Sequence, residues 1–180
     1  GHDAVVYLPK GSAQERLNNI RAEGARAEIT DLNYDDAVRW ASKQARQNGW
    51  ILVQDTAWPG YEIIPAWILQ GYGTIALEIA DELKKRCMAP PTHVFLQAGV
   101  GSFAGSMLGS FASLWGESAP QTCIVEPEAA NCLYLSAKAG QPTPIAGSMN
   151  SMMAGLCCGE PCTISWELLR CGAAAFAACE

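Results

Sequence analysis

Positive charge is scarce in this sequence. Its 180 residues include 12 lysines and arginines against 18 aspartates and glutamates, which gives a formal net charge of −6. Nucleic-acid-binding domains use clustered Lys and Arg to neutralise phosphates, and the longest basic run here is Lys84, Lys85 and Arg86. We therefore expect no nucleic-acid partner. With 49% apolar and 17% charged residues, the composition indicates a globular rather than a disordered protein.

The spacings of metal-binding and disulfide motifs are also missing. The sequence has only two histidines, and none of its eight cysteines forms a Cys-x-x-Cys pair. We expect no metal site, and we interpret most cysteines as small core residues. Cys132 and Cys158 are candidates for a reversible pair, with two free thiols as the favoured alternative.

Long uninterrupted apolar runs are absent as well. Gln70 and Glu78 interrupt the most apolar stretch, and no signal-peptide pattern opens the sequence. These absences predict a cytoplasmic protein without a membrane partner. The sequence opens at Gly1 without a methionine and stops at residues 177–180 in a helical pattern, so we expect an internal part of a longer polypeptide.

Predicted strands and helices alternate along the chain. Strands are predicted at residues 4–8, 26–30, 50–54, 93–97 and 122–125. Helices are predicted at residues 12–24, 33–47, 63–85, 102–115 and 128–138 and from residue 165 onward. Because parallel neighbouring strands need a crossover between them, this order predicts an α/β fold with parallel sheets. A Pro-Gly loop before the long helix divides the chain into two predicted lobes, residues 1–60 and residues 61–180.

Residue pairs at helix starts support these assignments. Ser12, with Glu15 three residues later, has the capping-box spacing and is expected to begin the first helix. Asp31 or Asn33 is expected to cap the second helix.

The most informative segment is an apolar strand that runs into a glycine-rich turn and opens a helix. The turn, residues 98–102, is called the glycine turn below. Glycines permit a tight turn, and the free N–H groups of the turn and the first helical residue converge where the helix dipole favours an anion. A phosphate is the usual ligand of such a turn. Plain packing is the alternative, since Gly101, Gly105 and Gly109 share one helical face.

Two acidic residues end predicted strands. Asp55 lies at the carboxyl end of a strand, where open α/β sheets place catalytic groups, and it is either a general base or a cap of the following turn. Glu126 lies about where a dinucleotide-binding fold places its ribose-binding carboxylate; the alternative is that Pro127 starts the next helix and Glu126 binds no ligand. A nucleotide-binding α/β module without catalytic activity is therefore an alternative. Against this alternative, the glycine turn follows three earlier predicted strands, whereas the dinucleotide motif lies in the turn between the first strand and the first helix.

Seven segments, in order over nearly the whole chain, carry a resemblance to a known family. They are Pro-Lys-Gly-Ser-Ala-Gln-Glu-Arg at 9–16, Asp-Leu-Asn-Tyr-Asp-Asp at 31–36, Gln-Asp-Thr-Ala-Trp at 54–58, Gln-Ala-Gly-Val-Gly at 97–101, Val-Glu-Pro at 125–127, and Met-Ala-Gly-Leu with Cys-Gly-Glu-Pro at 153–156 and 158–161. The chain resembles the diaminopropionate ammonia-lyase family, which is part of the tryptophan synthase β-like, fold-type II group of pyridoxal-phosphate enzymes.

The resemblance implies a cofactor and a reaction. Pyridoxal 5′-phosphate would be held by backbone N–H groups of Gly99, Val100, Gly101 and Ser102, which makes residues 61–180 part of a large cofactor-binding lobe and residues 1–60 part of a small one. The reaction would remove the β-amino group of 2,3-diaminopropionate to give pyruvate and ammonia. Asp55 would be the base for the D-isomer, the cofactor lysine would serve the L-isomer, and the whole protein would be a homodimer.

The sequence departs from the family pattern at two places. The family's Phe-Lys segment with the Schiff-base lysine and its Asp-Gly-Asn-His-Gly loop do not occur in these 180 residues. We therefore expect the 180 residues alone to be inactive. We also expect them to expose apolar surface, because a parallel sheet is normally covered on both faces.

Overall fold

The computed structural model describes residues 1–147 and 149–180, and the chain forms two compact units, Gly1–Leu52 and Val53–Glu180. Residues 53–60, which were expected in the first lobe, therefore belong with the second unit. The reason is their hydrogen bonding: the Ser102 hydroxyl donates to the carbonyl of Asp55 over 2.8 Å, and the Thr163 hydroxyl donates to the carbonyl of Ala57 over 3.1 Å.

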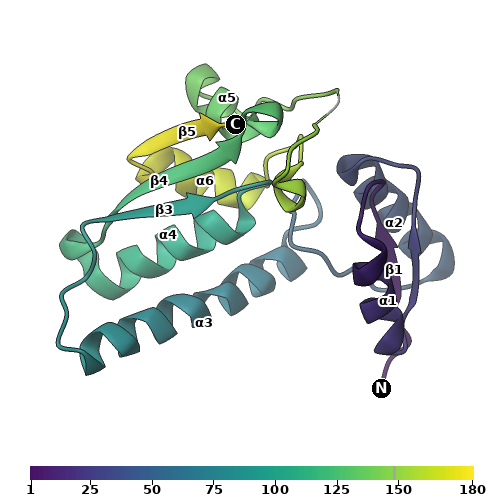
Figure 1. The fold of residues 1–180 in the computed structure, drawn as a ribbon, viewed down its shortest axis with the longest axis horizontal. Coiled ribbons are helices and arrows are strands. Elements are labelled where there is room, and N and C mark those ends of the chain that lie inside the picture. The colour runs from purple at the N-terminus through teal and green to yellow at the C-terminus, as the bar shows by residue number, and fades with distance from the viewer. Residues whose placement is uncertain (148) are drawn as a thin grey trace. The chain divides into compact units, whose positions relative to one another are not determined.

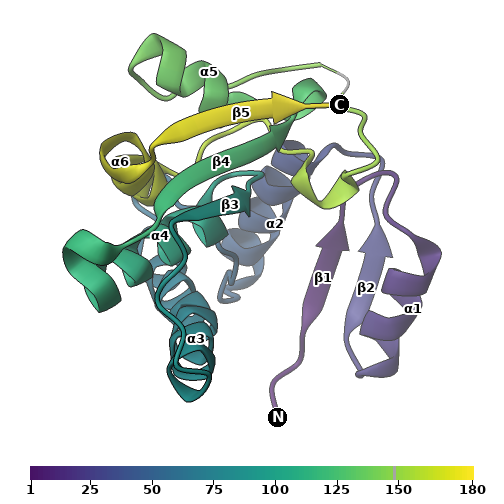
Figure 2. The same cartoon turned by 60° about the vertical axis from the view of Figure 1, so that its left-hand side comes forward.

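The first unit is a βαβ unit followed by a helix. Its elements are β1 (Val5–Leu8), α1 (Gln14–Ala22), β2 (Arg26–Ile29) and α2 (Tyr34–Asn48). The two strands are parallel and in register from Val5 opposite Arg26 to Leu8 opposite Ile29 (Figure 2). Buried Leu8, Leu17, Ala37 and Ala45 fill the space between strands and helices. The predicted alternation is confirmed here.

Two expectations for the first 54 residues are wrong. Ala13 precedes α1 without a side-chain cap, so Ser12 and Glu15 do not form the expected capping box. Residues 50–54 form no strand, and Ile51 and Val53 are largely exposed. A strand needs a neighbour for its backbone hydrogen bonds, and in the part of the chain that the structure describes β1 and β2 pair only with each other.

Among its described residues, the second unit contains a three-stranded parallel sheet and four α-helices (Figure 1). The elements in chain order are α3 (Ile63–Lys85), β3 (His93–Gln97), α4 (Ser102–Trp115), β4 (Gln121–Pro127), α5 (Cys132–Ala139), α6 (Thr163–Gly172) and β5 (Ala175–Cys179). Strand order is β3-β4-β5, with β4 in the centre. The α/β class with parallel sheets is confirmed.

The last segment corrects the expected helical pattern at residues 177–180. It forms β5, whose residues Ala175 to Cys179 pair with Cys123 to Pro127 of β4. Alanine favours helices when nothing else decides, but here the free edge of β4 offers a ladder partner, and the ring of Phe176 packs 6.3 Å from that of Trp166. Tertiary pairing has overridden local propensity.

One face of the sheet carries the core. Leu96 of β3 is 7% exposed and Ile124 of β4 is fully buried, whereas Phe95 on the opposite face is 71% exposed. The buried face packs on α4, which also packs against α3 and α6. Gly105 permits close contact between α4 and α6, because a Cβ there would lie 3.0 Å from that of Ser165. The packing interpretation is therefore confirmed for Gly105.

Apolar side chains are exposed on the second unit, as expected. Besides Phe95, the helix α3 exposes Trp67 and Leu77 by 64% and 55%. Contrary to the expectation from its polar interruptions, α3 is also long and apolar enough, by length and composition alone, to cross a membrane. Exposed apolar area of this kind marks a surface that is suited to further contacts.

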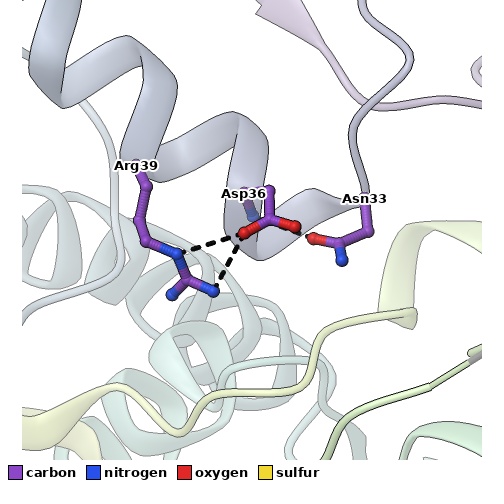
Figure 3. A network of polar contacts seen from close by, with 3 residues as sticks. All are labelled: Asn33, Asp36 and Arg39. Carbon is purple, nitrogen blue, oxygen red and sulfur yellow. Dashed lines mark hydrogen bonds and ion pairs between the residues drawn. The ribbon is translucent and has the colours of Figure 1, made fainter.

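The start of α2 yields a stability prediction. The side chain of Asn33 accepts a hydrogen bond from the backbone N–H of Asp36 over 2.8 Å, and Asp36 pairs with Arg39 on the helix surface (Figure 3). Asn33→Ala should lower the opening free energy of α2, measured by amide hydrogen exchange in the protein that contains this chain, by about 1 kcal/mol. Arg39→Ala, which removes an exposed ion pair, should cost less than about 0.5 kcal/mol. Equal costs would show that the cap does not hold this helix end.

Candidate functional site

The glycine turn joins β3 to α4 and presents unpaired backbone donors. The N–H of Ala98 still pairs with the carbonyl of Val125 over 2.9 Å, which is the last bond of the sheet on this side. Beyond it, among the described residues, the N–H groups of Gly99, Val100, Gly101 and Ser102 donate no hydrogen bond. Since buried N–H groups are nearly always paired, four successive unpaired donors at a helix start indicate an anion site.

The shape of the glycine turn depends on close packing behind it. Gly101 has φ +96°, in the left-handed region, and a Cβ there would lie 3.0 Å from the side chain of Leu169 and 3.1 Å from that of Leu133. A Cβ on Gly99 would lie 3.0 Å from Cys158 Sγ. Larger residues would displace the turn or its supports, so both glycines are required by conformation or by space.

Electrostatics at the start of α4 favour an anion. The helix has 14 residues, no side chain caps its N-terminus, and its first turn contains no acidic residue. The partial positive charge of the helix end is therefore not neutralised by the chain itself. A phosphate placed there would meet four N–H donors and no competing carboxylate from α4.

Asp55 lies beside the glycine turn. Its carbonyl accepts the hydroxyl of Ser102, and its carboxylate oxygen Oδ2 accepts the hydroxyl of Tyr72 over 3.1 Å. The sequence placed Asp55 at the end of a strand and in another lobe, but the structure has no strand there and puts it in the same unit as the glycine turn. The contact of its carboxylate is with a tyrosine of α3 rather than with the following turn.

Tyr72 was not singled out in the sequence. It lies in the middle of α3, and its ring stands edge-on to that of Phe103 in the first turn of α4, with ring centres 5.8 Å apart. Burial, the negative charge of Asp55 and the hydrogen bond to Asp55 together raise the pKa of Tyr72 to about 12. The hydroxyl therefore keeps its proton at neutral pH and can donate a hydrogen bond to Asp55. No spacing rule connects a helical tyrosine to an aspartate in a loop, so only the fold reveals the pair.

An aromatic pair shapes the loop that carries Asp55. The rings of Trp58 and Tyr61 are stacked with centres 4.5 Å apart. The hydroxyl of Tyr61 accepts the backbone N–H of Gln54 over 3.1 Å, directly before Asp55. Burial is the main cause that raises the pKa of Tyr61. The loop is thus held from inside by Tyr61 and from the glycine turn by Ser102.

Three cysteines also contact the site, and none of them forms a disulfide bond. Cys132 Sγ lies 3.6 Å from the carbonyl of Gly99, Cys158 packs on the same glycine, and Cys162 Sγ accepts the N–H of Ala57 over 3.3 Å. Cys132 and Cys158 are therefore not bonded to each other in the structure; both thiols lie next to Gly99.

Glu126 does not face a ligand as a ribose-binding carboxylate would. It is fully buried and accepts the backbone N–H groups of Leu133 and Tyr134. The segment after Pro127 begins as a short 3₁₀ turn, Glu128–Ala130, before α5 starts at Cys132. The observation that supported a nucleotide site is thereby removed.

Two open hollows in the second unit lie elsewhere. Their volumes are about 450 and 560 Å³, and both are lined by Glu128, Cys179 and Glu180 at the carboxyl ends of β4 and β5. Neither is lined by Asp55 or the glycine turn. The candidate site is defined by its donors and by the carboxylate of Asp55, not by the size of a cavity.

Comparison with known proteins agrees with this geometry. A family model described as "Pyridoxal-phosphate dependent enzyme" matches residues 1–179. The chain is similar to the diaminopropionate ammonia-lyase of Salmonella typhimurium, with 55% identity over 172 residues that cover 94% of this chain and 43% of that protein. The protein of the same name from Escherichia coli K12 is 47% identical, covering 100% and 45%.

A solved structure gives the same result. The crystal structure of Escherichia coli diaminopropionate ammonia lyase in complex with D-serine matches with a TM-score of 0.91 and 47% identity, covering 100% of this chain and 44% of that one. The chain therefore spans less than half the length of these diaminopropionate ammonia-lyases.

The contact between Tyr72 and Asp55 predicts a titration. In the protein that contains this chain, Asp55→Asn should lower the pKa of Tyr72 from about 12 toward its ordinary value of 10.0, because the negative charge that opposes the phenolate is gone. Carbon NMR titration of ring-labelled tyrosine would follow it, with the signal assigned by its loss in Tyr72→Phe. An unchanged pKa would mean that the hydroxyl does not face this carboxylate in solution.

Proposed function

Because this chain belongs to the family of pyridoxal-phosphate-dependent enzymes, we propose that the protein containing it is an ammonia-lyase that acts on 2,3-diaminopropionate. The products would be pyruvate and ammonia. The proposal draws on relatives at 47% and 55% identity that are named diaminopropionate ammonia-lyase. The Escherichia coli relative was solved with D-serine, which supports a small amino acid as the substrate here.

The four unpaired N–H groups are the observation that carries the proposal. They suit the phosphate of pyridoxal 5′-phosphate, the cofactor of the family: a dianion needs several donors, and a helix start supplies both donors and a favourable dipole. We assign the phosphate to Gly99, Val100, Gly101 and Ser102. The hydroxyl of Ser102 donates to Asp55, which leaves its N–H free for this purpose.

When bound, pyridoxal phosphate supplies an electron sink for a carbanion at the α-carbon of the substrate. The residues of this chain supply the proton transfer. Asp55 lies within the same unit as the proposed phosphate site, and its backbone carbonyl accepts the hydroxyl of Ser102 in the glycine turn. We assign the carboxylate of Asp55 the removal of the α-proton, a step for which a positioned side chain contributes a large factor.

Tyr72 has a supporting role in this assignment. By donating to Oδ2 of Asp55, it fixes the carboxylate and leaves Oδ1 to meet the substrate. The edge-on contact with Phe103 fixes the tyrosine in turn. A base that is held on one side reaches only one face of the α-carbon. The D- and L-isomers present their α-protons on opposite faces, so Asp55 serves one isomer, which we assign as the D-isomer.

We also propose a cytoplasmic homodimer without a nucleic-acid or membrane partner. The net charge of −6 supports the absence of nucleic acid. The exposed Trp67, Leu77 and Phe95 support contact with further protein surface. The nucleotide-binding alternative is given up, because the family match assigns a different cofactor and Glu126 is buried as a helix cap.

The role of Asp55 predicts a difference between isomers. In the whole protein that contains this chain, Asp55→Asn should lower kcat for D-2,3-diaminopropionate by about 100-fold or more and leave kcat for the L-isomer within a few fold. Pyruvate release measures both rates. The matched control is Asp81→Asn, an exposed aspartate of α3, which should change neither rate.

Equal losses for both isomers would contradict the assignment of Asp55 as a base for one face. Such a result would point instead to a general electrostatic role next to the cofactor. No production of pyruvate by the unmodified protein from either isomer would overturn the proposed substrate.

A further inference from the structure

A buried carboxylate that the proposed reaction does not use lies directly behind the glycine turn. Glu126 stands on β4, on the same buried face as Ile124, and is 0% exposed. Each of its carboxylate oxygens accepts one backbone N–H: Oε1 accepts that of Leu133 over 2.9 Å, and Oε2 accepts that of Tyr134 over 2.7 Å. Both donors belong to the first turn of α5.

Glu126 replaces the missing cap of α5. The residue before the helix, Asn131, makes no side-chain cap bond, so the first N–H groups of α5 would be unpaired in the protein interior without Glu126. Burying a carboxylate is costly, and burial raises the pKa of Glu126 to about 7 although the N–H bonds and the contact with Cys132 act against it. The burial of Glu126 thus opposes its charge, and the two N–H bonds stabilise it.

The helix end that Glu126 holds is in contact with the glycine turn at two points. Cys132 Sγ lies 3.6 Å from the carbonyl of Gly99, at hydrogen-bond distance for sulfur. The side chain of Leu133 lies against Gly101, where it comes within 3.1 Å of the position of a Cβ. Cys132 and Leu133 are both fully buried. The first two residues of α5 therefore contact both glycines whose N–H groups would bind phosphate.

We propose that Glu126 is a positioning residue for phosphate recognition: it holds the first turn of α5, and through that turn it holds the glycine turn in the shape that binds a phosphate. This inference rests on the proposed assignment of the phosphate to the glycine turn. Donors that are fixed before the ligand arrives bind an anion better than donors that must be arranged. The carboxylate does not touch the ligand; it fixes the residues that do.

The test compares two ligands that differ only in the phosphate. Pyridoxal phosphate and pyridoxal are titrated into the apo form of the whole protein that contains this chain. The dissociation constant of pyridoxal divided by that of pyridoxal phosphate measures phosphate recognition. Glu126→Gln keeps the size of the side chain, but it sets an NH₂ group against one of the two backbone N–H donors. The ratio should fall by about tenfold, while the dissociation constant of pyridoxal changes little. Glu128→Gln, the same change at an exposed site two residues away, should leave the ratio unchanged.

A second pair of variants tests the contact that runs through Cys132 and does not depend on the folding of Glu126→Gln. Cys132→Ser retains a donor toward the carbonyl of Gly99 and should retain most of the phosphate preference. Cys132→Ala removes the donor and should lower the ratio.

The outcomes separate this inference from the proposed site. If the unmodified protein shows no preference for pyridoxal phosphate over pyridoxal, the phosphate assignment itself fails. If it shows the preference and Glu126→Gln keeps it, or if both ligands weaken equally in Glu126→Gln, then Glu126 acts only on general stability and the inference is overturned. Equal ratios in Cys132→Ser and Cys132→Ala would overturn the route through Cys132.

Discussion

The need to satisfy four unpaired backbone donors in the glycine turn is the constraint on which the second unit depends. An α/β protein ordinarily pairs its buried N–H groups within strands and helices, yet here the sheet bonding stops at Ala98 and the helical bonding begins with the N–H of Gly105, which donates to Gly101. The donors between them require a ligand from outside the chain. These N–H groups make no backbone hydrogen bond and so remain available to a ligand. The surrounding residues must therefore keep the turn in the shape that binds it.

Those supports come from segments far apart in the sequence. The loop before α3 brings Asp55 to Ser102, the first turn of α5 brings Cys132 and Leu133, and Cys162 donates its N–H to the carbonyl of Val100 over 2.8 Å. Each contact uses a short side chain or the backbone, so each allows little change in length. The proposed base, the proposed phosphate donors and the buried Glu126 thus belong to one packed structure, in which a change at one point shifts the others.

Local signals in the sequence predicted much of this. The bounds of α3, β3 and α4 follow from Pro65, from the apolar run Val94-Phe95-Leu96 of β3 and from the glycine turn, and the sequence indicates the turn and Asp55 as the candidate site. What failed depended on distant partners. Residues 50–54 have a strand-like pattern but no neighbouring strand, residues 175–179 are rich in alanine but pair with β4, and Ser12 has the right spacing for a cap that is not made. Tyr72 and the role of Glu126 could not be predicted, because each depends on a contact between elements that no local spacing encodes.

The most direct measurement is a crystal structure of the protein that contains this chain with pyridoxal phosphate bound. We expect phosphate oxygens within about 3.2 Å of the N–H nitrogens of Gly99, Val100, Gly101 and Ser102. We also expect the carboxylate of Asp55 to face the reactive carbon of the cofactor, with the hydroxyl of Tyr72 on Oδ2. A phosphate bound at another helix start, with the four N–H groups directed at protein or solvent, would contradict this expectation.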